Sequence, residues 1–321
     1  MIFEKKILNI YGRKLLRRRD PDGRAYLFTA GDFDGLLYEE YTFLGDKGQT
    51  LYAYLYYRGE KRTDKLILLE HGMGCGHASY LKEIDLLTSR GYTVFTYDHT
   101  GTLKSGGDSI GGFSQSLSDL HRAVAFVRTL DGYEKSEISV IGHSWGGYSA
   151  MNISALHPDV SHVVAISGFT SPKAIQNQAL RGFLRLYRPT VYRSERDALP
   201  DYYRYDGIES LKVSKCPTLI IHSRDDKTCS FKAHFEKLRA ALNEKENITF
   251  LAVNNKNHHP QYTEEAVRYK SEFQRVLKAK MKRHELDGDE EKAAFVKSYD
   301  FHKMHEQDVE LWDKIIDFLE K

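Results

Sequence analysis

The chain has 321 residues, a net charge of +2, and hydrophobic and charged fractions of 41% and 29%. These fractions are near globular averages and argue against global disorder, and the balanced charge gives no reason to expect nucleic acid or an anionic membrane as a partner. The length suits one large α/β domain or two smaller ones.

We expect no export signal, membrane span or disulfide framework in this chain. Residues 1–6 are not followed by the apolar stretch of an export signal, and no apolar run is long enough to span a bilayer. Cys75, Cys216 and Cys229 are too few for a disulfide framework and lack metal-site spacing. We therefore expect a cytoplasmic protein with reduced thiols and no membrane partner.

In chain order, the first predicted element is an antiparallel hairpin, because aromatic, β-prone runs at residues 41–44 and 51–56 flank a Gly/Asp turn. Short apolar runs then alternate with helical segments, which is typical of a parallel sheet covered on both faces. The strands are expected at residues 66–69, 93–97, 138–141, 163–166, 218–221 and 248–253, and the helices at 80–89, 115–129, 147–156 and 230–242.

Residues 169–214 are too long for a simple crossover between two strands and are rich in aromatic residues and arginine. Such an insertion is either a lid over a site or a surface elaboration; we expect a cap on a core formed by residues 1–168 and 215–321. From residue 264 onward, the apolar spacing predicts two amphipathic helices packed on the body. The basic run at 278–283 is followed at once by acidic residues, so it is interpreted as a solvated helix face.

Ser144 stands between Gly142 and Gly146 where a strand should end and a helix begin. In that setting the G-x-S-x-G pattern indicates a nucleophile elbow, since glycines allow the close strand-to-helix approach. The alternative is a glycine-rich turn with an incidental serine.

Two later strand ends carry the partners that a nucleophilic serine needs. The strand at 218–221 is followed by Asp225 and Asp226, and the strand at 248–253 by His258 and His259. Nucleophile, acid and base thus occur in the chain order of a Ser-Asp-His triad on a parallel sheet.

From about residue 41 to residue 259, the chain resembles the α/β-hydrolase superfamily, in particular its serine aminopeptidase-like and feruloyl- or cinnamoyl-esterase-like members. The resemblance implies an α/β-hydrolase fold, in which a mostly parallel central sheet has helices on both faces and a cap inserted after the sixth strand. The family's acid lies four residues beyond a histidine, which favours Asp226 over Asp225. Its base follows a small residue, which favours His258 over His259.

The same resemblance implies an oxyanion hole and a neighbouring structural loop. The amide after the nucleophile, that of Trp145, would be one donor, and the H-G-x element at residues 71–73 would supply the amide of Met73. Residues 98–107 resemble the family's D-x-x-G-x-G-x-S loop, with Leu103 where glycine is usual, and we expect them to shape one wall of the site.

The predicted chemistry is two-step acyl transfer to water with no cofactor or metal; His302 and His305 lack a third ligand. The expected substrate is a small, apolar or aromatic carboxylic ester. An aminopeptidase or amidase, a thioesterase or acyltransferase, and a ligand receptor remain alternatives, and no oligomeric state is predicted. The cap side chains expected to bind substrate are Phe183, Tyr187 and Tyr192, while Arg181, Arg185 and Arg188 could meet a carboxylate or lie on the surface.

Overall fold

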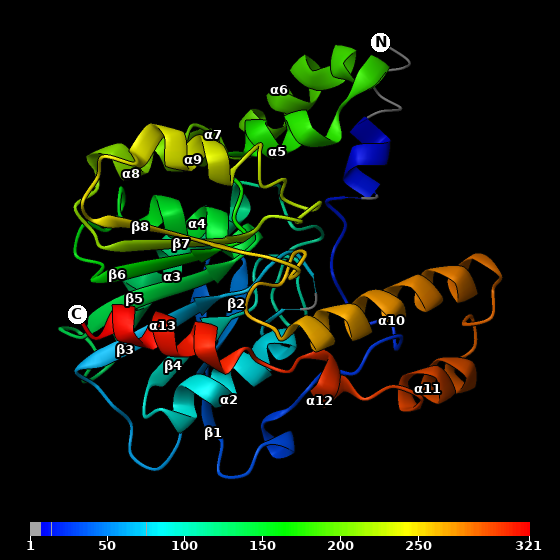
Figure 1. Ribbon diagram of the computed structural model, residues 1–321, viewed down its shortest axis with the longest axis horizontal. Helices are drawn as coiled ribbons and strands as arrows, with labels where there is room; N and C mark the ends of the chain where they lie inside the picture. Colours follow the sequence, from blue (N-terminus) through cyan, green and yellow to red (C-terminus); the bar gives the residue numbers. More distant parts are fainter. Residues whose placement is uncertain (1–7, 14, 75) are drawn as a thin grey trace.

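The computed structural model describes residues 8–13, 15–74 and 76–321 (Figure 1). Residues 1–6 and Cys75, which entered the expectations about export and thiols, lie outside these ranges. Among the described helices, none has both the length and the apolarity needed to cross a bilayer.

A single eight-stranded sheet forms the centre of the molecule. Its strands are β1 Leu37–Leu44, β2 Thr50–Tyr57, β3 Lys65–Glu70, β4 Thr93–Tyr97, β5 Glu137–His143, β6 His162–Ile166, β7 Thr218–Ser223 and β8 Ile248–Val253. The order is β1-β2-β4-β3-β5-β6-β7-β8, with β1 and β2 antiparallel, β2 and β4 antiparallel, and every later pair parallel. The predicted hairpin and mostly parallel sheet are therefore confirmed.

Helices cover both faces of this sheet (Figure 1) and thereby bury the apolar side chains of its central strands on both sides. One face is covered by α3 Gln115–Val127, α4 Trp145–Ile153, α8 Gly207–Val213 and α9 Phe235–Leu242. The other is covered by α2 Leu81–Ser89 and α13 Val309–Leu319.

The long insertion follows β6, as expected, and forms α5 Pro172–Ala179, the 3-10 segment η3 Gly182–Tyr187, α6 Arg188–Ala198 and α7 Pro200–Tyr203. Figure 1 shows α5 and α6 standing away from the sheet, beside the N-terminal helical segment. The chain leaves and returns at one point, where Gly207 N–H donates to the Thr170 carbonyl at 2.7 Å. Leu211 of α8 packs with Met151 of α4, so this last part of residues 169–214 lies on the body.

The C-terminal region contains more elements than the two predicted amphipathic helices. They correspond to α10 Glu264–Lys282 and α13, but α11 Asp289–Lys297 and α12 Phe301–Met304 lie between them. α11 packs along α10 through stacked rings of Phe273 and Phe295, whose centroids are 5.4 Å apart. The sequence of α11 is mostly charged and has few apolar residues, so it shows no amphipathic helical pattern.

Candidate active site

Ser144 occupies the turn between β5 and α4. Its backbone has φ 57° and ψ −108°, a left-handed conformation that is costly for a residue with a Cβ. A Cβ on Gly142 would lie 2.1 Å from the Gly146 carbonyl oxygen, and one on Gly146 would lie 2.4 Å from the Glu70 carbonyl oxygen. Both flanking positions therefore require glycine, and the turn has the geometry expected of a nucleophile elbow.

Asp226 follows β7 and is held from two directions. Its Oδ1 accepts the Thr228 and Cys229 backbone N–H groups at 2.8 and 3.0 Å, and its Oδ2 lies 2.8 Å from His258 Nδ1. Burial alone would raise the pKa of the Asp226 carboxyl, but hydrogen bonds with His222 and His258 hold it well below its usual range. Asp226 is thus a carboxylate at neutral pH.

Asp225 points elsewhere, although it was the alternative acid. Its carboxylate accepts from the Ser223 hydroxyl and, at 3.2 Å, from the Asn257 backbone N–H. These contacts fasten the loop after β8 to the end of β7.

His258 lies on the loop after β8 and joins the other two groups. Its Nε2 is 2.8 Å from Ser144 Oγ. When Nδ1 donates its proton to Asp226, Nε2 is left as an acceptor for the Ser144 hydroxyl. His259 also lines the cavity into which Ser144 and His258 open, but it stacks on Tyr262, with ring centroids 5.1 Å apart.

Tyr80 and His143 form a supporting layer that the sequence did not reveal. The Tyr80 hydroxyl accepts the Gly72 N–H at 2.9 Å and lies 2.7 Å from His143 Nδ1, while His143 Nε2 lies 2.8 Å from the His258 carbonyl oxygen. Burial, with a smaller contribution from the charge of His258, lowers the pKa of His143 to about 3. A neutral His143 therefore accepts from Tyr80 and donates to the His258 backbone. His143 occupies the first of the two variable positions of the G-x-S-x-G pattern, so the pattern did not point to it.

Ser144 and His258 open into a cavity of about 620 Å³. Its walls come from the loops after β3 and β5, from α5 of the insertion and from α10. Among the described residues that line it there is no Asp or Glu. Apolar contributions include Met73, Phe113, Trp145, Phe169, Ile175 and Val267, and polar ones include Tyr80, His143, Gln178, Asn257, Lys270 and Gln274.

Met73 and Trp145, the predicted oxyanion donors, both line this cavity. Trp145 begins α4, where backbone N–H groups have no acceptor within the helix. Its indole is used differently, because Nε1–H donates to the Phe113 carbonyl at 2.7 Å inside the core. The amide of Trp145, and not its ring nitrogen, is therefore the group available to a ligand.

Phe183, Tyr187 and Tyr192, which were predicted to bind substrate, do not line the cavity. After α5 the chain turns outward through η3, leaving the Phe183 side chain 75% exposed, and the Tyr192 hydroxyl donates to Asn177 Oδ1 on the outer side of α5. The insertion contributes Ile175, Gln178 and Ala179 to the cavity, so the role predicted for the three aromatic residues stays a prediction.

The loop at residues 98–107 and the pair His302 and His305, both noted in the sequence, make structural contacts. Leu103, at the position where glycine is usual, adopts φ 47°, so the loop keeps the conformation that normally selects glycine. His305 Nδ1 contacts the Phe301 carbonyl and Nε2 contacts Lys270 Nζ at 2.8 Å, so neither ring nitrogen faces His302.

Comparisons with known proteins agree with this architecture. Residues 61–203 match the model of the family described as "Serine aminopeptidase, S33". The protein of Pseudomonas syringae pv. syringae that is named "Putative carbamate hydrolase RutD" is 26% identical over 199 residues, covering 50% of this chain and 75% of that protein. The 2-hydroxy-6-oxononadienedioate/2-hydroxy-6-oxononatrienedioate hydrolase of Escherichia coli is 30% identical over 154 residues, and the match spans only 48% of its length.

Among solved structures, the Pyrococcus furiosus esterase Pf2001 superimposes with a TM-score of 0.59 at 18% identity, covering 83% of this chain and 97% of that one. The strand order, the elbow at Ser144 and the insertion after β6 fit the same fold. The chain therefore has the α/β-hydrolase fold, and the relatives and solved structures that it resembles are hydrolases.

Proposed function

We propose that the chain is a serine hydrolase that cleaves a carboxylic ester of a small, largely apolar substrate through an acyl-enzyme. The observation that carries the proposal is the hydrogen-bonded series from Ser144 Oγ to His258 to Asp226, with both distances at 2.8 Å. These distances lie within the range required for proton transfer from a nucleophile to a base and for orientation of that base.

Ser144 Oγ attacks the ester carbonyl while His258 Nε2 takes the hydroxyl proton. Asp226 keeps the remaining imidazole proton on Nδ1 and stabilises the imidazolium that forms. The amides of Met73 and Trp145 donate to the tetrahedral oxyanion. His258 then protonates the departing alcohol, and a water molecule, activated by the same imidazole, releases the acid and restores Ser144.

The cavity wall supports an ester more than an aminopeptide as substrate. An aminopeptidase must bind the α-ammonium group of its substrate, and a buried ammonium needs a carboxylate partner. No described residue lining the cavity is Asp or Glu, whereas Met73, Phe113 and Ile175 offer an apolar surface. Thioesterase and acyltransferase reactions would use the same three residues.

The test is labelling with a fluorophosphonate probe, followed by turnover of 4-nitrophenyl esters of increasing acyl length beside aminoacyl anilides. Wild type should label and prefer esters, and Ser144→Ala should do neither. Ser271→Ala is the matched control, because this serine also lines the cavity but donates to the Val267 carbonyl of its own helix at 2.8 Å. If the probe did not label wild type, the assignment of Ser144 as the nucleophile would be wrong. Labelling without turnover of any substrate would indicate a ligand receptor. Faster turnover of the anilides than of the esters would indicate a peptidase.

A further inference from the structure

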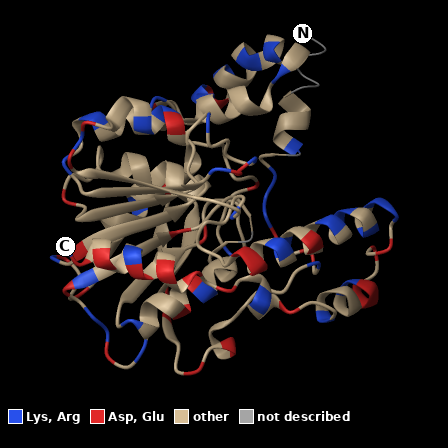
Figure 2. Ribbon diagram, in the orientation of Figure 1, with Lys and Arg blue, Asp and Glu red and all other residues tan. Residues whose placement is uncertain are grey.

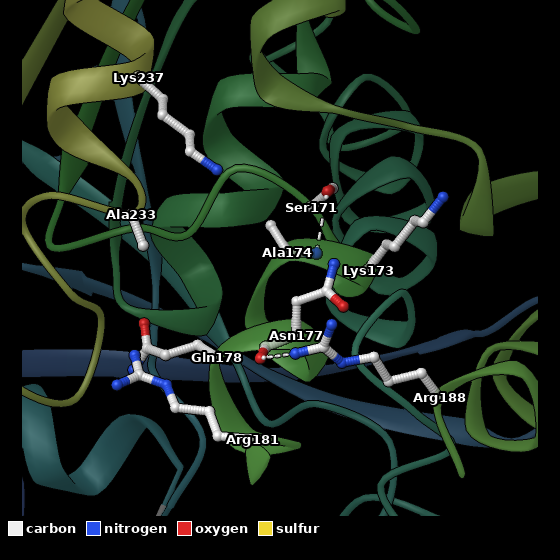
Figure 3. A pocket seen from close by; sticks show the side chains of 9 residues that line it. All are labelled: Ser171, Lys173, Ala174, Asn177, Gln178, Arg181, Arg188, Ala233 and Lys237. Carbon is white, nitrogen blue, oxygen red and sulfur yellow. Dashed lines mark hydrogen bonds between the residues drawn. The ribbon is translucent and has the colours of Figure 1, made fainter. Parts of the chain in front are cut away.

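A second, smaller hollow lies beside the active-site cavity, between α5 of the insertion and α9 of the body (Figure 3). Its volume is about 350 Å³. One side chain, that of Gln178, lines both spaces. The two hollows therefore adjoin each other at α5.

The smaller hollow is strongly cationic. Lys173, Arg181, Arg188 and Lys237 line it, and no Asp or Glu does. Within the described part of the chain, none of these four side chains lies in a salt bridge, whereas many other Lys and Arg residues of the protein do. Figure 2 shows blue segments predominating over red on α5 and α6. Cations gathered around a concavity without counter-charges repel one another, and an anion would relieve that repulsion.

The cationic groups reach the hollow from different elements of the fold, including α5, α6 and α9. Figure 3 shows the Lys237 side chain reaching from α9 toward α5 and the Arg188 guanidinium beside Asn177. Arg188 is fixed there, since it donates to the Leu180 and Asn177 carbonyls at 3.0 and 2.9 Å. Arginine forks and a lysine ammonium together are the usual means of holding a phosphate.

The Gln178 side chain lines both spaces and is held by hydrogen bonds. Its Nε2 donates to the Thr228 carbonyl at 2.8 Å, and its Oε1 accepts the Ser230 N–H at 2.9 Å. A ligand with an anion beside Arg181 and Lys237 would thus direct its remaining atoms past Gln178 toward Ser144.

We propose that the substrate of the Ser144 site carries a phosphate-type anion, remote from the scissile carbonyl, which binds Arg181, Arg188 and Lys237 in this hollow. The identification of this anionic ligand as the substrate of Ser144 rests on the ester hydrolysis proposed above. The proposal assigns the apolar part of the substrate to the larger cavity and the anionic part to the smaller one.

The test measures inhibition of 4-nitrophenyl butyrate hydrolysis by hexyl phosphate and by hexanol, which share an alkyl chain and differ in the anion. Arg181 and Lys237 are exposed, so Arg181→Gln/Lys237→Gln is expected to fold, which thermal unfolding checks. The double variant should raise the Ki ratio of hexyl phosphate to hexanol about tenfold, as expected for losing two charge-assisted contacts. Arg193→Gln, which removes one positive charge from α6 outside the hollow, should leave both constants unchanged.

Calorimetric titration of Ser144→Ala with hexyl phosphate and with inorganic phosphate separates this proposal from the proposed reaction. Tighter binding of hexyl phosphate, lost in the double variant, supports one ligand spanning both spaces even if no ester is ever turned over. Equal affinity for the two phosphates would overturn that link. An unchanged Ki ratio in the double variant, with normal ester turnover, would overturn the anion site and leave the hydrolase intact.

Discussion

Replacing Asp226 with asparagine should impair catalysis through the proton position on His258. The two backbone N–H groups of Thr228 and Cys229 point at Oδ1, so the asparagine oxygen is expected to stay on that side. The amide NH₂ then takes the place of Oδ2, which lies 2.8 Å from His258 Nδ1. Because both groups cannot donate to each other, Nδ1 must become the acceptor and the imidazole proton moves to Nε2.

A proton on Nε2 faces Ser144 Oγ and prevents the imidazole from accepting the hydroxyl proton. The same wrong tautomer lowers kcat about 10,000-fold in the serine protease triad, which corresponds to about 5 kcal/mol of transition-state stabilisation. We expect a loss of about 1,000- to 10,000-fold in kcat for 4-nitrophenyl butyrate, with a small change in KM. Stopped assays with active-site titration give kcat per folded enzyme.

Asp225→Asn is the matched control, since it makes the same chemical change one residue away. The Asp225 carboxylate contacts Ser223 and the Asn257 amide instead of the imidazole, so kcat should stay within about tenfold of wild type. If Asp225→Asn were the damaging change, or if Asp226→Asn kept kcat within tenfold, the assignment of the acid would be refuted.

Three further predictions concern the surroundings of the site. Trp145→Phe should lower the free energy of unfolding by about 1–3 kcal/mol, because the Phe113 carbonyl loses its buried donor; a large fall in kcat as well would contradict a role for the amide alone. Gly142→Ala should lose more than about 4 kcal/mol of stability, since its Cβ would meet a backbone oxygen at 2.1 Å, whereas Gly12→Ala, with nothing within 4 Å, should unfold in denaturant like wild type. Burial raises the pKa of Glu83 from 4.5 to about 7, so between these pH values the native state keeps a proton that the unfolded chain releases, and stability falls as pH rises. We expect the unfolding free energy of Glu83→Gln minus that of wild type to rise by up to about 3 kcal/mol between pH 4.5 and pH 8, because only wild type loses stability over this range. A difference that does not change with pH would disprove this.

The parts of the fold that followed from sequence are those governed by local physics. Strands β3 to β7 are short apolar runs because they are largely buried on both faces, and the half-buried edge strand β8 is also mostly apolar. The positions of all six strands were therefore predictable to within one or two residues. The elbow was equally readable, since only glycine fits at positions 142 and 146. The order of Asp226 and His258 along the chain then followed from the strand ends.

What could not be predicted depends on how separate elements meet. The spacing of α10 indicated an amphipathic helix but not that Lys270 and Gln274 would face the cavity, because periodicity does not identify the neighbouring surface. Tyr80 supports the site from the start of α2, 63 positions before His143, with no pattern to connect them. The positions of the aromatic residues of η3 and α6 were unpredictable for the same reason, because composition cannot say on which side of α5 they lie.

The hydrogen bonds of Gln178 also limit how the insertion can move. They tie α5 to residues 228 and 230, and residue 228 supplies one of the two amides that hold the Asp226 carboxylate. Any opening that carried α5 outward would pull on the segment that positions the acid. Substrate entry that leaves the triad undisturbed therefore requires α5 to stay in place.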